Sequence, residues 1–116
     1  MKILIVEDEP LIRIGLSSLA TDWGYEALEA GNADEAIAMI EQNPGVRLVL
    51  TDVDMPGTMD GIRLAHFIRR RWPPIKLVVI SGKMAVSASE LPEGTRFFGK
   101  PYQDHKLHEA ITELLL

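Results

Sequence analysis

Residues 2–10 read KILIVEDEP, a short apolar run that leads at once into three acidic residues and a proline. The run Lys2–Val6 is rich in branched side chains and almost wholly apolar, which is typical of a strand in a sheet that is covered on both sides. Pro10 suits the first turn of a helix, where its missing N–H would have no partner in any case. The stretch therefore predicts a buried strand that passes through an acidic turn into a helix.

The same order of short strand and amphipathic helix recurs along the chain. Further strands are predicted at Tyr25–Ala30, Val46–Leu50, Lys76–Ile80 and Thr95–Gly99. Apolar residues at a 3.6-residue period predict helices at Leu11–Trp23, Ala33–Gln42, Gly61–Arg71, Lys83–Glu90 and Tyr102–Leu115. This alternation predicts an α/β fold, in which a five-stranded parallel sheet carries five helices on its two faces. Because crossovers are right-handed, few topologies remain, and we favour the flavodoxin-like, doubly wound order 2-1-3-4-5.

Two helix ends carry clear signals. Gly24 follows the first predicted helix, at a position where glycine often takes a left-handed conformation. Asn32 and Glu35 have the spacing of a capping box at the start of the second helix. Both signals support the predicted boundaries.

Length and composition exclude several classes of protein. The 116 residues fit a single domain, and we expect residues 1–116 to form one. The absence of cysteine excludes disulfides, thiolate nucleophiles and cysteine-based zinc sites, and it makes a reducing cytoplasm the natural setting. The net charge of −5 is a poor match for nucleic acid. No apolar run approaches the roughly 18 residues that span a bilayer, so we expect no direct membrane binding.

Polar side chains that could bind a ligand or take part in a reaction follow four of the five predicted strands. They are Glu7, Asp8, Asp52, Asp54, Ser81 and Lys100. The carboxyl ends of parallel strands meet at one edge of the sheet, so these side chains should converge there. Carboxylates repel at short range, which favours a chemical role over a purely structural one. Ligands that are all oxygen suit a hard cation such as Mg²⁺.

Four sequence fragments at these positions resemble the receiver domain of bacterial two-component response regulators. The fragments are ILIVEDE at 3–9, TDVDMPGTMDG at 51–61, VVISG at 78–82 and FFGKPY at 97–102. They occur in the family's order, and the resemblance covers essentially the whole chain. It implies a phosphorylation-controlled signalling module that is not an enzyme in its own right. It also implies a histidine kinase or phosphotransfer protein as phosphodonor, and an output domain, a target protein or a second copy of the chain as further partners.

The resemblance gives each acidic residue a role. Asp52 matches the phosphoacceptor, whose carboxylate attacks the phosphorus of a phosphohistidine. Asp8 matches the acid that binds Mg²⁺ or Mn²⁺ directly, and Glu7 matches its partner, which acts mostly through water. The metal would also contact Asp52 and the backbone carbonyl of Asp54.

The remaining matches concern the phosphoryl group and the response to it. Lys100 matches the lysine that pairs with phosphoryl oxygens, and Ser81 matches the hydroxyl residue that moves toward them. Phe97 matches the aromatic switch that rotates inward when Ser81 moves. Pro101 matches a proline that follows a cis bond in the family. Phosphoryl transfer needs mainly positioning and neutralisation of charge, which these groups supply.

Two features depart from the family's common pattern. Thr58 adds a residue to the loop that follows Asp52, so that loop is expected to be longer. Asp54 and Lys83 occupy the two positions that tune hydrolysis of the aspartyl phosphate in the family. Their opposite charges suggest that they pair with each other across the site.

Other interpretations remain open at this point. The acidic pair at residues 7–8 would also suit a solvated helix start, and Asp54 would suit a turn. Core packing is the simple explanation of Phe97. A small hydrolase or phosphatase with an aspartyl intermediate would need a cap or a substrate pocket. A nucleotide or flavin carrier would need a glycine-rich or hydroxyl-rich loop where this chain has EDEP. A receiver that has lost phosphotransfer is disfavoured by the intact acidic, hydroxyl and lysine residues.

Overall fold

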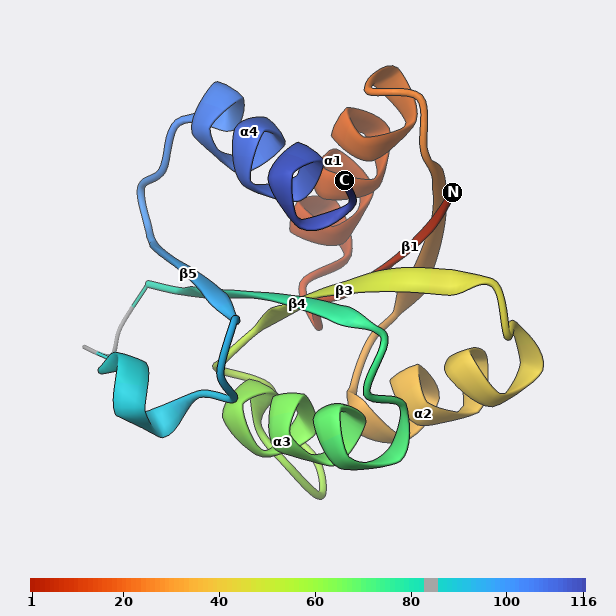
Figure 1. The fold of residues 1–116 in the computed structure, drawn as a ribbon, viewed down its shortest axis with the longest axis vertical. Coiled ribbons are helices and arrows are strands. Elements are labelled where there is room, and N and C mark those ends of the chain that lie inside the picture. Colours follow the sequence, from red (N-terminus) through yellow and green to blue (C-terminus); the bar gives the residue numbers. More distant parts are fainter. Residues whose placement is uncertain (83–85) are drawn as a thin grey trace.

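A five-stranded parallel sheet runs through the middle of the molecule (Figure 1). The computed structural model describes residues 1–82 and 86–116. The strands are β1 (Lys2–Val6), β2 (Glu26–Ala30), β3 (Val46–Asp52), β4 (Lys76–Ser81) and β5 (Arg96–Gly99). Their spatial order is β2-β1-β3-β4-β5, and every neighbouring pair is parallel. The predicted sheet order is confirmed.

Four α-helices in the described part of the chain cover the two faces of the sheet. They are α1 (Pro10–Asp22), α2 (Ala33–Gln42), α3 (Gly61–Arg71) and α4 (Asp104–Leu114). Figure 1 shows α1 and α4 on one face and α2 and α3 on the other. Successive residues of β3 alternate between the two layers: Leu48 packs with Leu107 of α4, and Val49 packs with Leu64 of α3. Burial on both faces explains the almost wholly apolar central strands.

The predicted helix-end signals are confirmed with one difference. Pro10 is the first residue of α1, and Gly24 has a φ of 93° just beyond the end of that helix. The side chain of Asn32 accepts a hydrogen bond from the backbone N–H of Glu35 at 2.8 Å. The Glu35 carboxylate accepts from the backbone N–H of Gly31 rather than of Asn32, so the reciprocal bond is displaced by one residue.

The fifth predicted helix, at Lys83–Glu90, is wrong in the part that the structure describes. The first three residues of that range lie outside the described part, and Ala88–Glu90 form a single 3₁₀ turn, η1. Ser87 has an extended backbone, and its N–H donates to the Glu90 carboxylate at 3.0 Å, so Ser87 precedes a helical turn and does not lie inside a longer helix. Pro92 then prevents a helix from continuing past η1.

Close packing fixes the start of α3 against the end of β3. The backbone N–H of Gly61 donates to the carbonyl of Val53 at 2.9 Å. A Cβ atom at Gly61 would overlap the carbonyl oxygen of Asp52. The last residue of β3 can therefore lie beside α3 only because residue 61 has no side chain.

Two glycine-to-alanine substitutions should have opposite effects on the free energy of unfolding. Gly61→Ala should lower the free energy of unfolding by about 2–3 kcal/mol, because backbone atoms must move to admit the methyl group. Gly15→Ala, in the exposed interior of α1 with no atom within 4 Å of the added Cβ, should raise it by about 0.5–1 kcal/mol. Urea unfolding of both variants measures the difference. A Gly61→Ala protein as stable as the wild type would show that the approach is looser than described.

Candidate functional site

Three carboxylates meet at the carboxyl edge of the sheet. Glu7 and Asp8 follow β1, and Asp52 is the last residue of β3. Each offers an oxygen atom, and the three oxygens lie within 4.8 Å of one another. Asp8 is exposed, whereas Glu7 and Asp52 are only 3% and 7% exposed. The predicted convergence of acidic side chains is therefore present in the structure.

Lys100 supplies a nearby positive charge. Its Nζ atom lies 3.5 Å from Oδ1 of Asp52 and 3.9 Å from Oε1 of Glu7. The backbone N–H of Lys100 donates to the carbonyl of Ser81 at 2.8 Å, which ties the end of β5 to the end of β4. The peptide bond between Lys100 and Pro101 is cis, as the resemblance implied.

Asp52 is buried without full hydrogen bonding. No partner among the described residues meets hydrogen-bond geometry with its Oδ1 atom, although Lys100 lies at ion-pair distance. A buried carboxylate oxygen in this state loses its hydration without a matching bond, which is costly unless another group binds it. The site therefore has unused capacity for a ligand at Asp52.

Burial dominates the electrostatics of both inner carboxylates. Desolvation raises the pKa of Asp52 above its ordinary value, and the charge of Asp54 adds to this, while Lys100 acts in the opposite direction. Desolvation also raises the pKa of Glu7; the Asp52 charge adds to it, and the backbone N–H of Glu9 and the charge of Lys100 oppose it. The net direction of the pKa shift is upward for both carboxyls, so the charge of Lys100 does not outweigh their burial.

These properties fit a hard divalent cation. The available ligand atoms are carboxylate oxygens, the ligands that Mg²⁺ prefers, and few of them are needed because Mg²⁺ keeps several waters. A cation would bind the uncompensated Asp52 oxygen and offset the repulsion that raises the pKa of both buried acids.

A shallow cavity of about 360 Å³ holds most of the predicted residues. Its lining consists of Glu7, Asp8, Glu9, Ile12, Asp52, Asp54, Gly82 and Lys100. Sequence reasoning gave no role to Ile12, whose side chain is 42% exposed and lies beside the acids. It had also given no role to Glu9, whose position directly after Glu7 and Asp8 was the available signal.

The other predicted residues lie at or near this edge. Ser81 ends β4 and is buried. Phe97 is half-buried on β5 and packs against the apolar cluster between the sheet and the α2 and α3 helices. Thr58 extends its loop toward α2 and donates to Asp34 at 2.9 Å. Lys83 lies outside the described residues, so its pairing with Asp54 stays a prediction.

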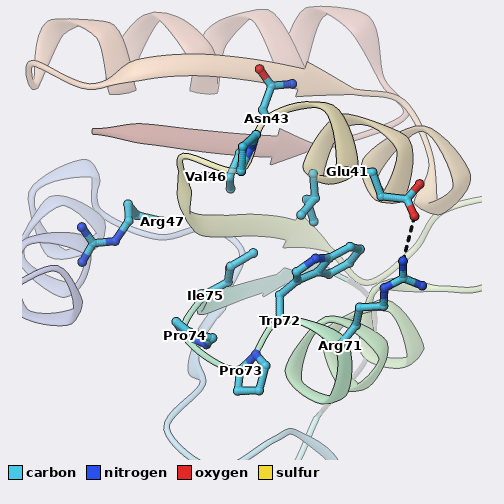
Figure 2. A pocket seen from close by; sticks show the side chains of 11 residues that line it. Glu41, Asn43, Val46, Arg47, Arg71, Trp72, Pro73, Pro74 and Ile75 are labelled. Atoms are coloured by element: carbon cyan, nitrogen blue, oxygen red, sulfur yellow. Dashed lines mark hydrogen bonds and ion pairs between the residues drawn. The ribbon is translucent and has the colours of Figure 1, made fainter.

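A second cavity, of about 370 Å³, lies at the opposite edge of the sheet, between the ends of α2 and α3 (Figure 2). Trp72 and the prolines 44, 73 and 74 give it a largely apolar wall. The ion pair between Arg71 and Glu41, at 3.0 Å, closes one side. The lining of this second cavity contains no group of carboxylates, so the acidic edge is the candidate for the functional site.

Comparisons with known proteins identify the family of this chain. The model of the response regulator receiver domain family matches residues 3–112. Sensor kinase CckA of Brucella abortus is 34% identical over 117 residues, which cover 97% of this chain and 12% of that kinase. A response regulator receiver protein from Sinorhizobium medicae has a TM-score of 0.91 at 28% identity, with coverage of 99% and 94%. Response regulator TrrA from Thermotoga maritima, in complex with Mg²⁺–BeF, has a TM-score of 0.83 at 27% identity, covering 97% of each chain.

Fold and site thus define a doubly wound α/β protein with an acidic centre at the carboxyl edge of its sheet. The chain belongs to the response regulator receiver domains, the phosphorylation-controlled signalling domains of two-component systems. It spans 23–53% of further curated relatives that it matches. None of the helices in residues 1–82 and 86–116 is long and apolar enough to cross a membrane.

The uncompensated charge predicts how Asp52→Asn changes stability. The folded pKa values of Asp52 and Glu7 lie above their ordinary values of 3.8 and 4.5, so the unfolded chain releases these protons first as pH rises. Their contribution to stability therefore falls as pH rises from about 4 through the folded pKa values, and the penalty persists at neutral pH. In chelator at pH 7, Asp52→Asn should be more stable than the wild type, and the difference should shrink on acidification.

Metal should shift the difference in stability in favour of the wild type. At free Mg²⁺ about ten times its dissociation constant, the wild type should gain about 1.4 kcal/mol, and Asp52→Asn should gain much less. Urea unfolding at several pH values, with Mg²⁺ or chelator, gives both quantities. Asp22→Asn, at the exposed end of α1, is the control and should change stability by less than about 0.5 kcal/mol. If Asp52→Asn is the less stable protein in chelator, hydrogen bonds to Asp52 outweigh the repulsion.

Proposed function

We propose that this chain accepts a phosphoryl group on Asp52 and thereby changes its surface for a partner. The observation that carries the proposal is the buried Asp52 Oδ1 atom, which has no hydrogen-bond partner among the described residues and lies 3.5 Å from Lys100. Two further carboxylates stand beside it within metal-binding range. A family of phosphorylation-controlled domains with the same sheet order gives the chemistry its context.

The proposed reaction is a transfer from a phosphohistidine. An oxygen of the Asp52 carboxylate forms a bond to phosphorus while the bond from phosphorus to the donor's imidazole nitrogen breaks. That nitrogen keeps the electron pair and takes up a proton. Lys100 then pairs with a phosphoryl oxygen, and the Ser81 hydroxyl donates to another. Positioning and charge neutralisation are the main requirements of such a transfer.

Mg²⁺ or Mn²⁺ is the proposed cofactor. Glu7, Asp8 and Asp52 would hold it, together with the backbone carbonyl of Asp54. When bound, the metal would neutralise negative charge on the phosphoryl oxygens. The all-oxygen ligand set supports this assignment, as does a related receiver whose structure contains Mg²⁺–BeF.

The signalling role follows from the added charge. A phosphoryl group brings about −1.5 to −2 charges into an acidic site and biases the conformations around it. We assign Ser81 and Phe97 to the response, in which Phe97 rotates inward from its half-buried position as Ser81 approaches the phosphoryl group. Asp54, paired with Lys83, would tune how long the aspartyl phosphate survives.

The proposed setting is a two-component pathway in the cytoplasm, in keeping with a chain that has no cysteine. Residues 1–116 act as one receiver domain. A histidine kinase or phosphotransfer protein supplies the phosphoryl group, and an output domain or target protein responds. The domain's own chemistry is limited to accepting and losing the phosphoryl group.

Labelling by a small phosphodonor tests the assignment of Asp52. With acetyl phosphate and Mg²⁺, the wild type should gain one phosphoryl group, and Asp52→Asn should gain none. Asp54→Asn is the matched control, because it removes a neighbouring carboxylate but keeps the backbone carbonyl; it should still be labelled. Intact-protein mass spectrometry, followed by trapping of the acyl phosphate with a nucleophile, identifies the modified residue. Equal labelling of wild type and Asp52→Asn would overturn the proposal.

A further inference from the structure

Arg13 joins three structural elements beside the acidic cluster. It lies on α1, and its Nη1 atom donates to the backbone carbonyl of Glu7 at 2.9 Å. Its Nε atom donates to the Glu29 carboxylate of β2 at 3.1 Å. The Arg13 side chain is 22% exposed, so it is held largely within the structure.

Arg13 supplies a hydrogen-bond donor to the Glu7 carbonyl at the point where the pairing of β1 ends. The pairing of β1 with β2 ends at Val6, and the N–H of Glu7 adds one bond to the carbonyl of Ala30 at 3.0 Å. The carbonyl of Glu7, which lies beyond the last paired residue of β1, accepts a hydrogen bond from Arg13 at 2.9 Å. Without that guanidinium it would lack this donor next to a buried side chain.

The polar atoms of Glu7 are thus almost all fixed. Its N–H and carbonyl are bonded, and its Oε2 atom accepts from the backbone N–H of Glu9 at 3.0 Å. The remaining oxygen, Oε1, faces Lys100 at 3.9 Å. Asp8 follows directly after the carbonyl that Arg13 holds, so the same bond restricts where its carboxylate can lie.

We infer that Arg13 is a positioning residue for cation binding, which it supports by fixing the Glu7–Glu9 turn so that the carboxylates face Asp52 before the cation arrives. This inference rests on the proposed function. Arg13 itself touches neither the metal nor the phosphoryl group. Its planar guanidinium reaches Glu7 and Glu29 at once, which a lysine ammonium at the end of a flexible chain does not reproduce.

The sign of the effect separates positioning from simple electrostatics. Arg13 is a cation near an acidic site, so its removal should strengthen Mg²⁺ binding if only charge mattered. Loss of positioning should weaken it instead, because the acids must be ordered when the metal binds. The two explanations therefore predict opposite shifts in the dissociation constant.

Calorimetric titration of unphosphorylated residues 1–116 with MgCl₂ tests the inference. Arg13→Ala should raise the Mg²⁺ dissociation constant about tenfold, the lower end of the loss seen when groups that orient metal ligands are removed. Arg13→Lys, which keeps one donor, should restore part of the affinity. Glu29→Gln should weaken binding less than Arg13→Ala. Arg71→Ala is the control, since it breaks an exposed arginine–glutamate pair at the far edge of the sheet and should leave the affinity unchanged.

Urea unfolding in chelator accompanies each titration, because a purely structural role would lower stability and leave the affinity of the folded protein intact. Unchanged or tighter Mg²⁺ binding by Arg13→Ala overturns the inference. If that variant does not fold, unchanged affinity in both Arg13→Lys and Glu29→Gln overturns it. A wild type that binds no Mg²⁺ overturns the proposed metal and this inference together, whereas metal binding without labelling of Asp52 overturns only the proposed phosphoacceptor.

Discussion

Two carboxylates, Glu7 and Asp52, are buried side by side at the end of the central strands, and Lys100 is the lysine of the described residues that lies at ion-pair distance from both. Much of the surrounding structure serves this arrangement. The parallel order of the sheet brings the ends of β1 and β3 together, and Gly61 lets α3 begin against the backbone of Asp52. The remaining negative charge at this edge favours the binding of a cation.

The sequence was sufficient for the sheet and for the gathering of acidic side chains and a lysine at one edge of it. Continuous apolar runs predicted central strands, and the right-handed crossover rule left few strand orders. The side chains that follow those strands, such as Asp52 and Lys100, were then placed at one edge by topology alone. Local information therefore decided the fold wherever the hydrophobic pattern was strong.

The failures have local physical causes. In the described part of the range predicted as a fifth helix, Ser87 and Glu90 satisfy each other within a single turn, which a hydrophobic pattern does not reveal. Ile12 follows the helical period, yet its side chain is 42% exposed and lines the cavity that holds the acids. The bond from Arg13 to the Glu7 carbonyl depends on side-chain direction in three dimensions, and no spacing in the sequence encodes it.

Side-chain carboxyl titration by ¹³C NMR measures the central claim most directly. In the metal-free wild type, Glu7 and Asp52 should each titrate above their ordinary values of 4.5 and 3.8. Saturating Mg²⁺ should lower both pKa values, because a bound cation favours the charged carboxylates. Ordinary pKa values in the metal-free protein would contradict the claim that burial disfavours the charged forms of Glu7 and Asp52. Values that Mg²⁺ leaves unchanged would contradict the claim that a cation binds beside them.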